Sequence, residues 1–327
     1  MIRRGSLLVK LVKLVDHIPK PPLEKKLSRG RPKFYSDTVF LKAVIIMIVK
    51  HLHKVGELLS VLEEPTHEMQ TLRKLLTQEG RYPSRRTWER RLKQIPETLP
   101  AQIRCLAQHL LSCIKPFDIC GRAAAIDSTV LPAKGGVWHK KDRERGLIPH
   151  TSIDTDAHWT KSDYHGWVYG FKLHLITTVS WVWIPLAARL TPANCADNVM
   201  APDLIGDLCA EIRYLLGDTH YNAENVRQAF EDETHFLVAS KPGPYPHDDD
   251  GKDVRRIFHS LRSRSIENFN EQFKGIFDVH TQVPTKGLIN TARFALGAVF
   301  VYQLILLFRF QEGLDLRQGL KACLKAG

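Results

Sequence analysis

The stretch Arg122-Ala-Ala-Ala-Ile-Asp127-Ser-Thr129 decides the fold of the second part of the chain. Its apolar run predicts a short buried strand that ends at Asp127. The stretch Arg213-Tyr-Leu-Leu-Gly217-Asp218 repeats this pattern, with an acid directly after a short apolar strand. Two acids at the ends of neighbouring central strands would lie a few ångströms apart at one edge of a sheet. The two stretches together therefore predict an acidic edge.

A third acid follows on a predicted amphipathic helix, in Ser265-Ile-Glu267-Asn-Phe-Asn-Glu-Gln-Phe-Lys274. Asp127, Asp218 and Glu267 then form an acidic trio that can hold divalent metal ions. Unpaired carboxylates at this spacing would repel and raise one another's pKa, and a pair of Mg²⁺ ions about 3.5–4 Å apart would remove that penalty. We expect that Mn²⁺ can replace Mg²⁺. Any one acid alone is more simply explained as a cap or a solvated side chain, but three in this order favour a metal site for phosphodiester chemistry.

The residues from Arg122 onward predict a mixed α/β domain. Strands are expected at residues 122–126, 168–179, 182–190, 213–217 and 235–240, and helices at 198–209, 222–231, 262–277 and 288–309. Residues 132–166 and 241–256 are expected to form loops. Three strands followed by alternating helices and strands is the order of a ribonuclease-H-like mixed sheet.

The first part of the chain predicts an all-helical domain. Its helices are expected at residues 37–49, 55–63, 67–78, 85–93 and 101–114, with Pro96 and Pro100 separating the last two. The domains expected along the chain are a flexible, irregular basic leader (1–35), the helical domain (36–118), the ribonuclease-H-like domain (119–310) and a C-terminal tail (311–327).

The excess of positive over negative charge lies entirely in the N-terminal third of the chain. The formal net charge is +12, and residues 1–120 hold 23 Lys and Arg against 11 Asp and Glu, whereas residues 121–327 hold 24 of each kind. A basic domain joined to a neutral one indicates a polyanionic partner for the first. The best candidate for contact with DNA phosphates is the basic helix at 85–93, with a solvated amphipathic helix as the alternative. Its basic residues are Arg85, Arg86, Arg90, Arg91 and Lys93.

The six cysteines and the apolar segments bear on the cellular compartment. None of the cysteines forms a C-x-x-C motif, which favours reduced thiols in a cytosolic protein over disulfides or a zinc site. The run from Phe294 to Phe308 has no charge but is only fifteen residues long, short of the ~20 that span a bilayer. A buried C-terminal helix and no membrane partner are expected.

Five motifs together resemble those of a known family. They are Asp127, Tyr169-Gly-Phe-Lys172-Leu-His174-Leu175, Leu190-Thr-Pro192-Ala-Asn194-Cys-Ala-Asp197, Leu216-Gly-Asp218-Thr-His-Tyr221, and Ile266-Glu267 with Phe269 and Lys274. In order and spacing they resemble the bacterial insertion-sequence DDE transposases of the IS-four/IS-five-like superfamily. The resemblance covers roughly residues 120–310, and a weaker resemblance is found at Gly30-Arg-Pro-Lys-Phe-Tyr-Ser36.

The resemblance implies a function for the whole chain. Asp127, Asp218 and Glu267 would be a metal-binding catalytic triad, and Lys274 would contact DNA phosphate. The helical domain would bind terminal inverted repeats, and the other would cleave at their 3′ ends and join them to target DNA. The resemblance also implies a homodimer on paired ends, in the cytoplasm with the nucleoid. A DNA-binding regulator with a silent site, or a nuclease without strand transfer, are the alternatives.

The chain departs from the family pattern just before Glu267. Ser260 and Ser263 stand where the family usually has a Tyr and an Arg. Arg262 or Arg264 is expected to supply the lost charge.

Other residues have two interpretations each. Lys172 and His174 share a strand face and either pack there or contact DNA, and Asp197 either caps a helix or supports the metal site. The charge run from His139 to Arg145 is either solvated or clamps a phosphate backbone. Arg29-Gly-Arg-Pro32 is either a minor-groove hook or part of a disordered leader.

Overall fold

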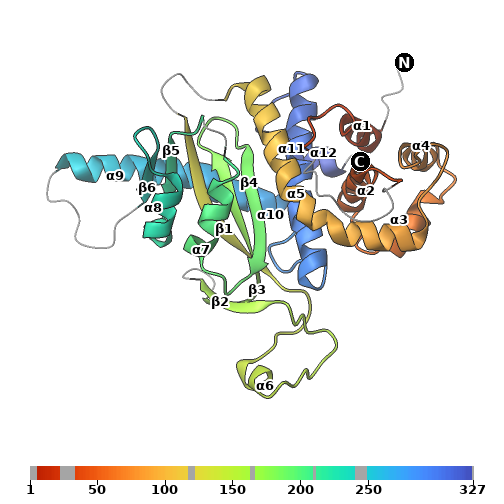
Figure 1. The fold of residues 1–327 in the computed structure, drawn as a ribbon, viewed down its shortest axis with the longest axis horizontal. Helices are drawn as coiled ribbons and strands as arrows, with labels where there is room; N and C mark the ends of the chain where they lie inside the picture. Colours follow the sequence, from red (N-terminus) through yellow and green to blue (C-terminus); the bar gives the residue numbers. More distant parts are fainter. Residues whose placement is uncertain are drawn as a thin grey trace. The chain divides into compact units, whose positions relative to one another are not determined.

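The computed structural model describes residues 6–22, 34–116, 122–162, 166–208, 211–239 and 249–325. The chain divides into two compact units, one formed by Met1–His109 with Ala292–Gly327 and the other by Leu110–Thr291 (Figure 1). The residues Arg29 to Pro32, considered above as a groove-binding hook, lie outside the described ranges.

The second unit is built on a six-stranded mixed sheet. Strand β3 pairs antiparallel with β1 on one side and with β2 and β4 on the other, while β1, β5 and β6 run parallel to one another. The strands are β1 (Ala123–Pro132), β2 (His158–Ser162), β3 (Gly166–Thr178), β4 (Pro185–Pro192), β5 (Tyr214–Gly217) and β6 (Phe236–Ala239). The expected mixed α/β architecture and its strands are confirmed, with two differences in length and content.

The first difference is that β1 continues past Asp127 to Pro132, so that Asp127 lies inside a strand and not at its end. Its antiparallel partner β3 supplies backbone hydrogen bonds along this whole length, from Ala124 opposite Thr178 to Pro132 opposite Gly170. The second difference is that the expected loop at 132–166 contains a short helix, α6 (Lys140–Glu144), and strand β2.

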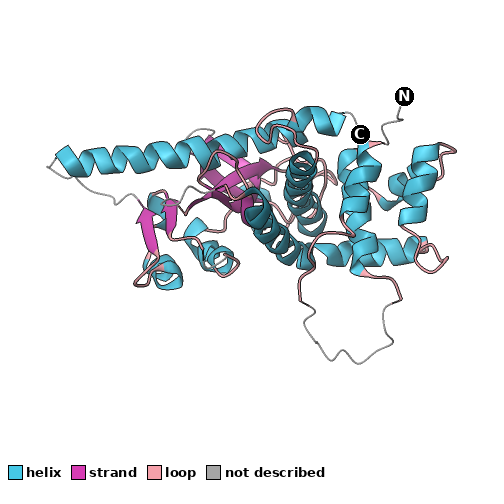
Figure 2. Cartoon of the chain, turned by 90° about the horizontal axis from the view of Figure 1, so that it is seen from above, coloured by secondary structure: helices cyan, strands magenta, loops and turns pink. Residues whose placement is uncertain are grey.

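Helices cover both faces of the sheet. Figure 2 shows α9 and α10 along one face, with α7 and α8 on the other. The helical segments are α7 (Asp197–Ile205), η1 (Thr219–Tyr221), α8 (Glu224–Phe230), α9 (Asp249–Arg262), the π-helical turn η2 (Ser263–Glu267) and α10 (Asn268–Phe277). The loop expected at 241–256 is thus helical from Asp249, and the helix expected at 262–277 continues α9 through a π-helical turn.

The first unit is all-helical in the residues described. Its helices are α1 (Leu7–Leu14), α2 (Asp37–Val49), α3 (Val55–Leu62), α4 (His67–Leu75), α12 (Leu320–Lys325), and most of α5 (Arg85–Ile114) and α11 (Leu288–Gln311). The expectation of an irregular leader is wrong for α1, because Leu8, Leu11 and Val12 bury one face of it. The expected tail at 311–327 likewise contains α12.

Helix α5 is continuous where two helices were expected. Pro96 and Pro100 lie inside it, and each removes one backbone hydrogen bond. The flanking apolar side chains Leu92, Leu99 and Ile103 are fully buried. Burial along this face outweighs the local cost of the prolines.

Helix α11 is the expected buried C-terminal helix, but from Ala292 it belongs to the first unit and not to the second. A Cβ on Gly297 would lie 2.7 Å from Ile48 and from Val44, so this glycine allows α11 and α2 to approach closely. By length and composition α11 is apolar enough to cross a membrane, but 89% of its most apolar window is buried in the protein. This burial is the property of a core helix.

Candidate active site

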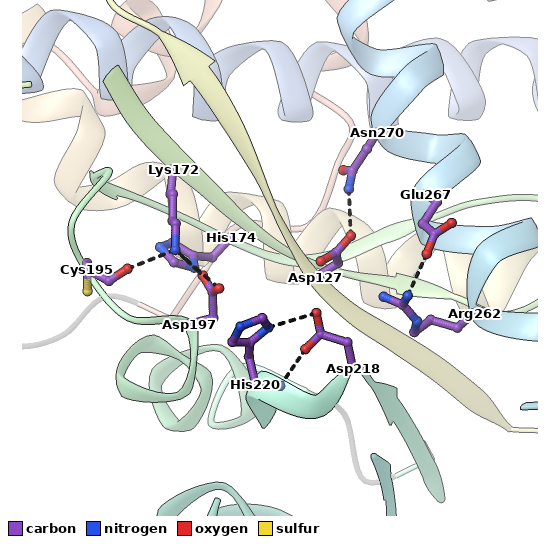
Figure 3. Close-up of polar contacts among 10 residues, drawn as sticks. All are labelled: Asp127, Lys172, His174, Cys195, Asp197, Asp218, His220, Arg262, Glu267 and Asn270. Atoms are coloured by element: carbon purple, nitrogen blue, oxygen red, sulfur yellow. Dashed lines mark hydrogen bonds and ion pairs between the residues drawn. The ribbon is translucent and has the colours of Figure 1, made fainter. Parts of the chain in front are cut away.

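The two aspartates of the trio are brought together by the parallel pairing of β1 and β5. Ala123 lies opposite Tyr214 and Ala125 opposite Leu216, and the same register continued by two residues places Asp127 beside Asp218. The chain leaves β5 at this point, because the Asp218 carboxylate caps the η1 turn by accepting from the backbone N–H of His220 at 2.9 Å. Figure 3 shows Asp127 part-way along its strand and Asp218 at the turn that follows β5.

The surroundings of Asp127 raise the pKa of its carboxyl group. Burial raises its pKa to about 7, Asp218 and Glu267 add to the rise, and the Arg262 guanidinium opposes it. Asp218 and Glu267 are therefore both within electrostatic range of Asp127. The Asp127 carboxylate accepts a hydrogen bond from Asn270 Nδ2 at 3.2 Å (Figure 3).

Asp218 is held by the turn that follows it. Its Oδ2 lies 3.3 Å from Nδ1 of His220. The ring of Tyr221 packs under the turn, and a Cβ on Gly217 would lie 2.9 Å from the Cβ of Tyr221. Only glycine therefore lets the strand end directly over the buried tyrosine.

Glu267 is held by its own helix. Arg262 Nη2 donates to its Oε1 at 2.6 Å, and Ser263 Oγ donates to its Oε2 at 2.6 Å. Of the two arginines expected to supply the missing charge, Arg262 therefore reaches the acid, whereas Arg264 is exposed.

The donor chemistry of the trio fits a divalent cation, since hard cations such as Mg²⁺ take carboxylate oxygens as ligands and a nearby positive charge would favour the ionised form of Asp127. In the part of the chain that the structure describes, no three His, Cys, Asp or Glu side chains are arranged to hold a metal ion. The trio was expected to converge on such a site. The backbone gathers the three acids, but the carboxylate of Glu267 is directed at Arg262 and Ser263 instead.

Lys274 and Lys172, both expected to contact DNA, lie in different surroundings. Burial lowers the pKa of Lys274, while Glu271 and Asp127 oppose the fall, so its ammonium is within electrostatic range of the first aspartate. Lys172 is bound inside the protein, where its Nζ lies 3.1 Å from Oδ1 of Asp197 and 3.2 Å from the carbonyl oxygen of Cys195. Both interactions leave its ammonium little freedom to reach a phosphate.

Asp197 and His174 complete a buried polar cluster beside the site. Asp197 is the first residue of α7, and the N-cap position is occupied by Ala196, so the N-cap interpretation is wrong. Its Oδ1 lies 3.5 Å from Nδ1 of His174, whose Nε2 pairs with Thr191 at 2.8 Å. Burial lowers the pKa of His174 to about 4, and its neutral ring is a packed core group.

The expected DNA-binding helix divides into two faces. Arg85, Arg86, Arg90 and Lys93 are exposed on α5. Arg91 is buried, forms an ion pair with Asp37, and lies over the ring of Phe40 at 4.4 Å. The expectation that Arg91 contacts DNA is wrong, because position 91 shares the core face with the buried Trp88 three residues earlier.

Asn270 and Ser263 were missed as site residues by the sequence analysis. Asn270 follows Glu267 by three residues, and helical spacing places both on one face of the helix. A polar residue between the buried Phe269 and Phe273 was the signal that could have revealed it. Ser263 was interpreted only as the loss of an arginine, yet its hydroxyl bonds to Glu267.

Comparison with known protein families identifies the family of the chain that carries this acidic site. The profile of the family described as "Transposase DDE domain" matches residues 119–298, more than half of the chain. The chain belongs to this family. DDE transposases cleave DNA and transfer strands in transposition and recombination, and they generally use divalent metal ions. The matched segment contains all three acids of the trio.

Solved structures of other transposases are similar to this transposase only at low scores. One is the piggyBac transposase synaptic complex with hairpin DNA, at 9% identity and a TM-score of 0.40, covering 98% of this chain and 78% of that one. Another is the Mos1 transposase paired-end complex with the left transposon end, at 15% identity and a TM-score of 0.21, covering 93% and 82%. A search of curated proteins found no match. The assignment therefore rests on the family profile.

Proposed function

We propose that this transposase binds the terminal inverted repeats of a mobile element, cleaves at their 3′ ends and joins them to target DNA. The observation that carries the proposal is the register of β1 and β5, which aligns Asp127 with Asp218. Glu267 is added as the third acid because its charge contributes to the raised pKa of Asp127. Within the family we propose the branch of bacterial insertion-sequence transposases, IS-four/IS-five-like, whose motifs the chain resembles.

The order of the strands supports a ribonuclease-H-like identity for the second unit. Antiparallel β4, β3 and β1 are followed by parallel β5 and β6, with helices on both faces. In this order β5 lies beside β1, so the acid that follows the end of β5, Asp218, comes beside Asp127 within β1.

We propose that Asp127, Asp218 and Glu267 hold two divalent cations, Mg²⁺ or Mn²⁺. Bound there, the ions would supply positive charge at the attacking and leaving oxygens of an in-line displacement. The residues of the chain orient the carboxylates: Asn270 holds Asp127, the backbone of His220 holds Asp218, and Arg262 with Ser263 holds Glu267.

The proposed reaction consists of two displacements at one site. In the first, the oxygen of water bonds to phosphorus at the element end, and the bond to the 3′ oxygen breaks, leaving a 3′-hydroxyl. In the second, this hydroxyl bonds to a target phosphorus and displaces the target 3′ oxygen. No covalent protein–DNA intermediate is required. Lys274, beside Asp127, would contact the phosphate next to the cleaved bond and hold the cut end between the two steps.

The helical unit would bind the terminal repeats through the exposed face of α5. Arg85, Arg86 and Arg90 there can contact phosphates. We further propose a homodimer on paired ends, acting on the nucleoid in the cytoplasm.

The test is a cleavage and joining assay with the full chain. The DNA flanking the gene supplies the inverted repeats, which are offered as intact duplexes and as precut ends in Mg²⁺. We expect nicking of the first and joining of the second to target DNA. DNA binding with neither activity would instead indicate a regulator, and nicking without joining of precut ends would indicate a nuclease.

A further inference from the structure

The helix that carries Glu267 contains one π-helical turn, which has one residue more than a turn of α-helix, where it passes the active site. Helix α9 ends at Arg262, the π-helical turn η2 covers Ser263–Glu267, and α10 begins at Asn268. In an α-helix, residues five apart are about 140° apart around the axis and face different directions. A π-helical turn closes i to i+5 and brings these residues together, and such turns occur often at functional sites.

The contacts of Glu267 depend on this geometry. Arg262, five residues earlier, donates to Oε1 at 2.6 Å. Ser263, four residues earlier, donates to Oε2 at 2.6 Å. Both carboxylate oxygens are thus held from the preceding turn.

The Arg262 side chain is 14% exposed and that of Glu267 40% exposed, so the cation is the more enclosed member of the pair. Arg262 also acts on a second acid of the site, because its charge opposes the rise in the pKa of Asp127. Arg264, two residues along, is exposed and bonds through its backbone carbonyl to Asn268. The π-helical turn therefore directs one of the two arginines towards the acids and leaves the other at the surface.

We propose that Arg262 is a positioning residue for Glu267, and that the π-helical turn is the device that presents it from five residues away. The proposal rests on the proposed function in one respect, that Glu267 is catalytic. In an α-helix, an arginine would have to stand four residues before Glu267 to reach it, and that position is Ser263. The extra residue of the π-helical turn lets Arg262, five residues before Glu267, make the contact instead.

The first test compares two neighbouring arginines in the full chain. We expect Arg262→Ala to lower kcat for cleavage about 10–100-fold, the usual effect of removing the partner of a metal-binding side chain. The KM for DNA should change little, and Arg262→Lys should restore part of kcat. Arg264→Ala is the matched control and should cleave like the parent. Equal effects of Arg262→Ala and Arg264→Ala would overturn the proposal.

The second test removes the π-helical turn. Deletion of Arg264 leaves Arg262 four residues before Glu267, the spacing that an α-helix aligns. We expect this deletion to keep most of kcat, and the added Arg262→Ala substitution to remove it again. If the deletion variant folds but is as inactive as Arg262→Ala, Arg262 does not act by positioning Glu267.

The third test does not depend on activity and remains decisive if the deletion variant does not fold. The melting temperatures of the parent, Arg262→Ala, Glu267→Gln and the double variant form a thermodynamic cycle. We expect the double variant to lose less than the sum of the single losses. Additive losses would show that the two side chains are not coupled and would overturn the proposal. If the Arg262 and Glu267 side chains prove to be coupled but the parent protein does not cleave DNA, the result would contradict the proposed function. It would leave the interaction between Arg262 and Glu267 intact.

Discussion

Asn270 Nδ2 donates a hydrogen bond to Asp127 Oδ2 at 3.2 Å. The helix that carries the third acid of the trio therefore also holds the first, across the boundary between a helix and a sheet. Asn270 is buried, and its Oδ1 has no hydrogen-bond partner among the residues described. A buried polar atom without a partner is a signal of a catalytic or ligand-binding role, which agrees with a place for Asn270 in the site.

We predict that Asn270→Ala lowers cleavage about tenfold, because loss of an orienting partner commonly costs about 10–100-fold at a metal-binding residue. Binding to end DNA should not change. Asn268→Ala, at an exposed position of the same helix, is the control. Cleavage rates are compared in Mg²⁺ on one duplex, and equal rates for the two variants would remove Asn270 from the site.

Gly217 is predicted to be irreplaceable before Asp218. In Gly217→Ala the new Cβ would lie 2.9 Å from Cβ and 3.1 Å from Cδ2 of Tyr221, so the ring must move. Overpacking of this kind costs about 1–3 kcal/mol, and it should also displace Asp218 and reduce cleavage. Denaturant unfolding measures the loss. Gly56→Ala in α3, where a Cβ meets nothing within 4 Å, should be neutral or slightly stabilising, and an equally mild Gly217→Ala would contradict the packing.

The raised pKa of Asp127 predicts a pH dependence of stability. Its folded-state pKa is about 7, against about 3.9 in an unfolded chain. Between these values the folded state keeps a proton that the unfolded state has released. The contribution to stability is therefore full below about pH 4 and is lost as the pH rises towards about 7.

Calorimetry in chelator can isolate this group by comparison with Asp127→Asn, which does not titrate. We expect the melting temperature of the parent to fall relative to the variant as the pH rises from about 4 to about 7. His174 titrates equally in both proteins and cancels. A difference that does not change with pH would show that Asp127 has an ordinary pKa.

The two faces of α5 predict two kinds of variant. Charge reversal of Arg85, Arg86 and Arg90 should weaken DNA binding and flatten its dependence on salt by about 0.9 in slope per lost phosphate contact. Arg91→Ala should leave the slope unchanged but cost about 1–3 kcal/mol of stability, because Asp37 and the carbonyl of Tyr35 lose their partner. Fluorescence anisotropy at several salt concentrations checks the first result and denaturant unfolding the second. If the triple variant kept the parent slope, the DNA-binding face would lie elsewhere.

The sequence predicts the structure best where a short local pattern of residues is enough to define the element. Short apolar runs marked the parallel strands β5 and β6, and an acid directly after β5 marked Asp218. The phase of α5 was also readable, since Arg91 follows the buried Trp88 by three residues, one helical turn. Attention to this spacing would have placed Arg91 in the core.

Other features depend on distant partners and left no local signal. The polar residues Ser128 and Thr129 favour a strand that ends at Asp127. Strand β1 nevertheless continues through them, because β3 pairs with this segment. Pro96 reads as a helix break, yet burial of neighbouring leucines carries α5 through it. No pattern of apolar residues encodes the π-helical turn before Glu267 or the contact between Arg262 and Glu267 that it allows.

The most direct test of the central claim is the cleavage rate of three single variants on terminal-repeat DNA in Mg²⁺. Asp127→Asn, Asp218→Asn and Glu267→Gln each remove one carboxylate charge and leave the helical unit intact. We expect all three to bind the DNA like the parent. Each should lose more activity than the about 10–100-fold that loss of a supporting partner costs. A variant that binds and cleaves like the parent would show that its acid is not part of the catalytic trio.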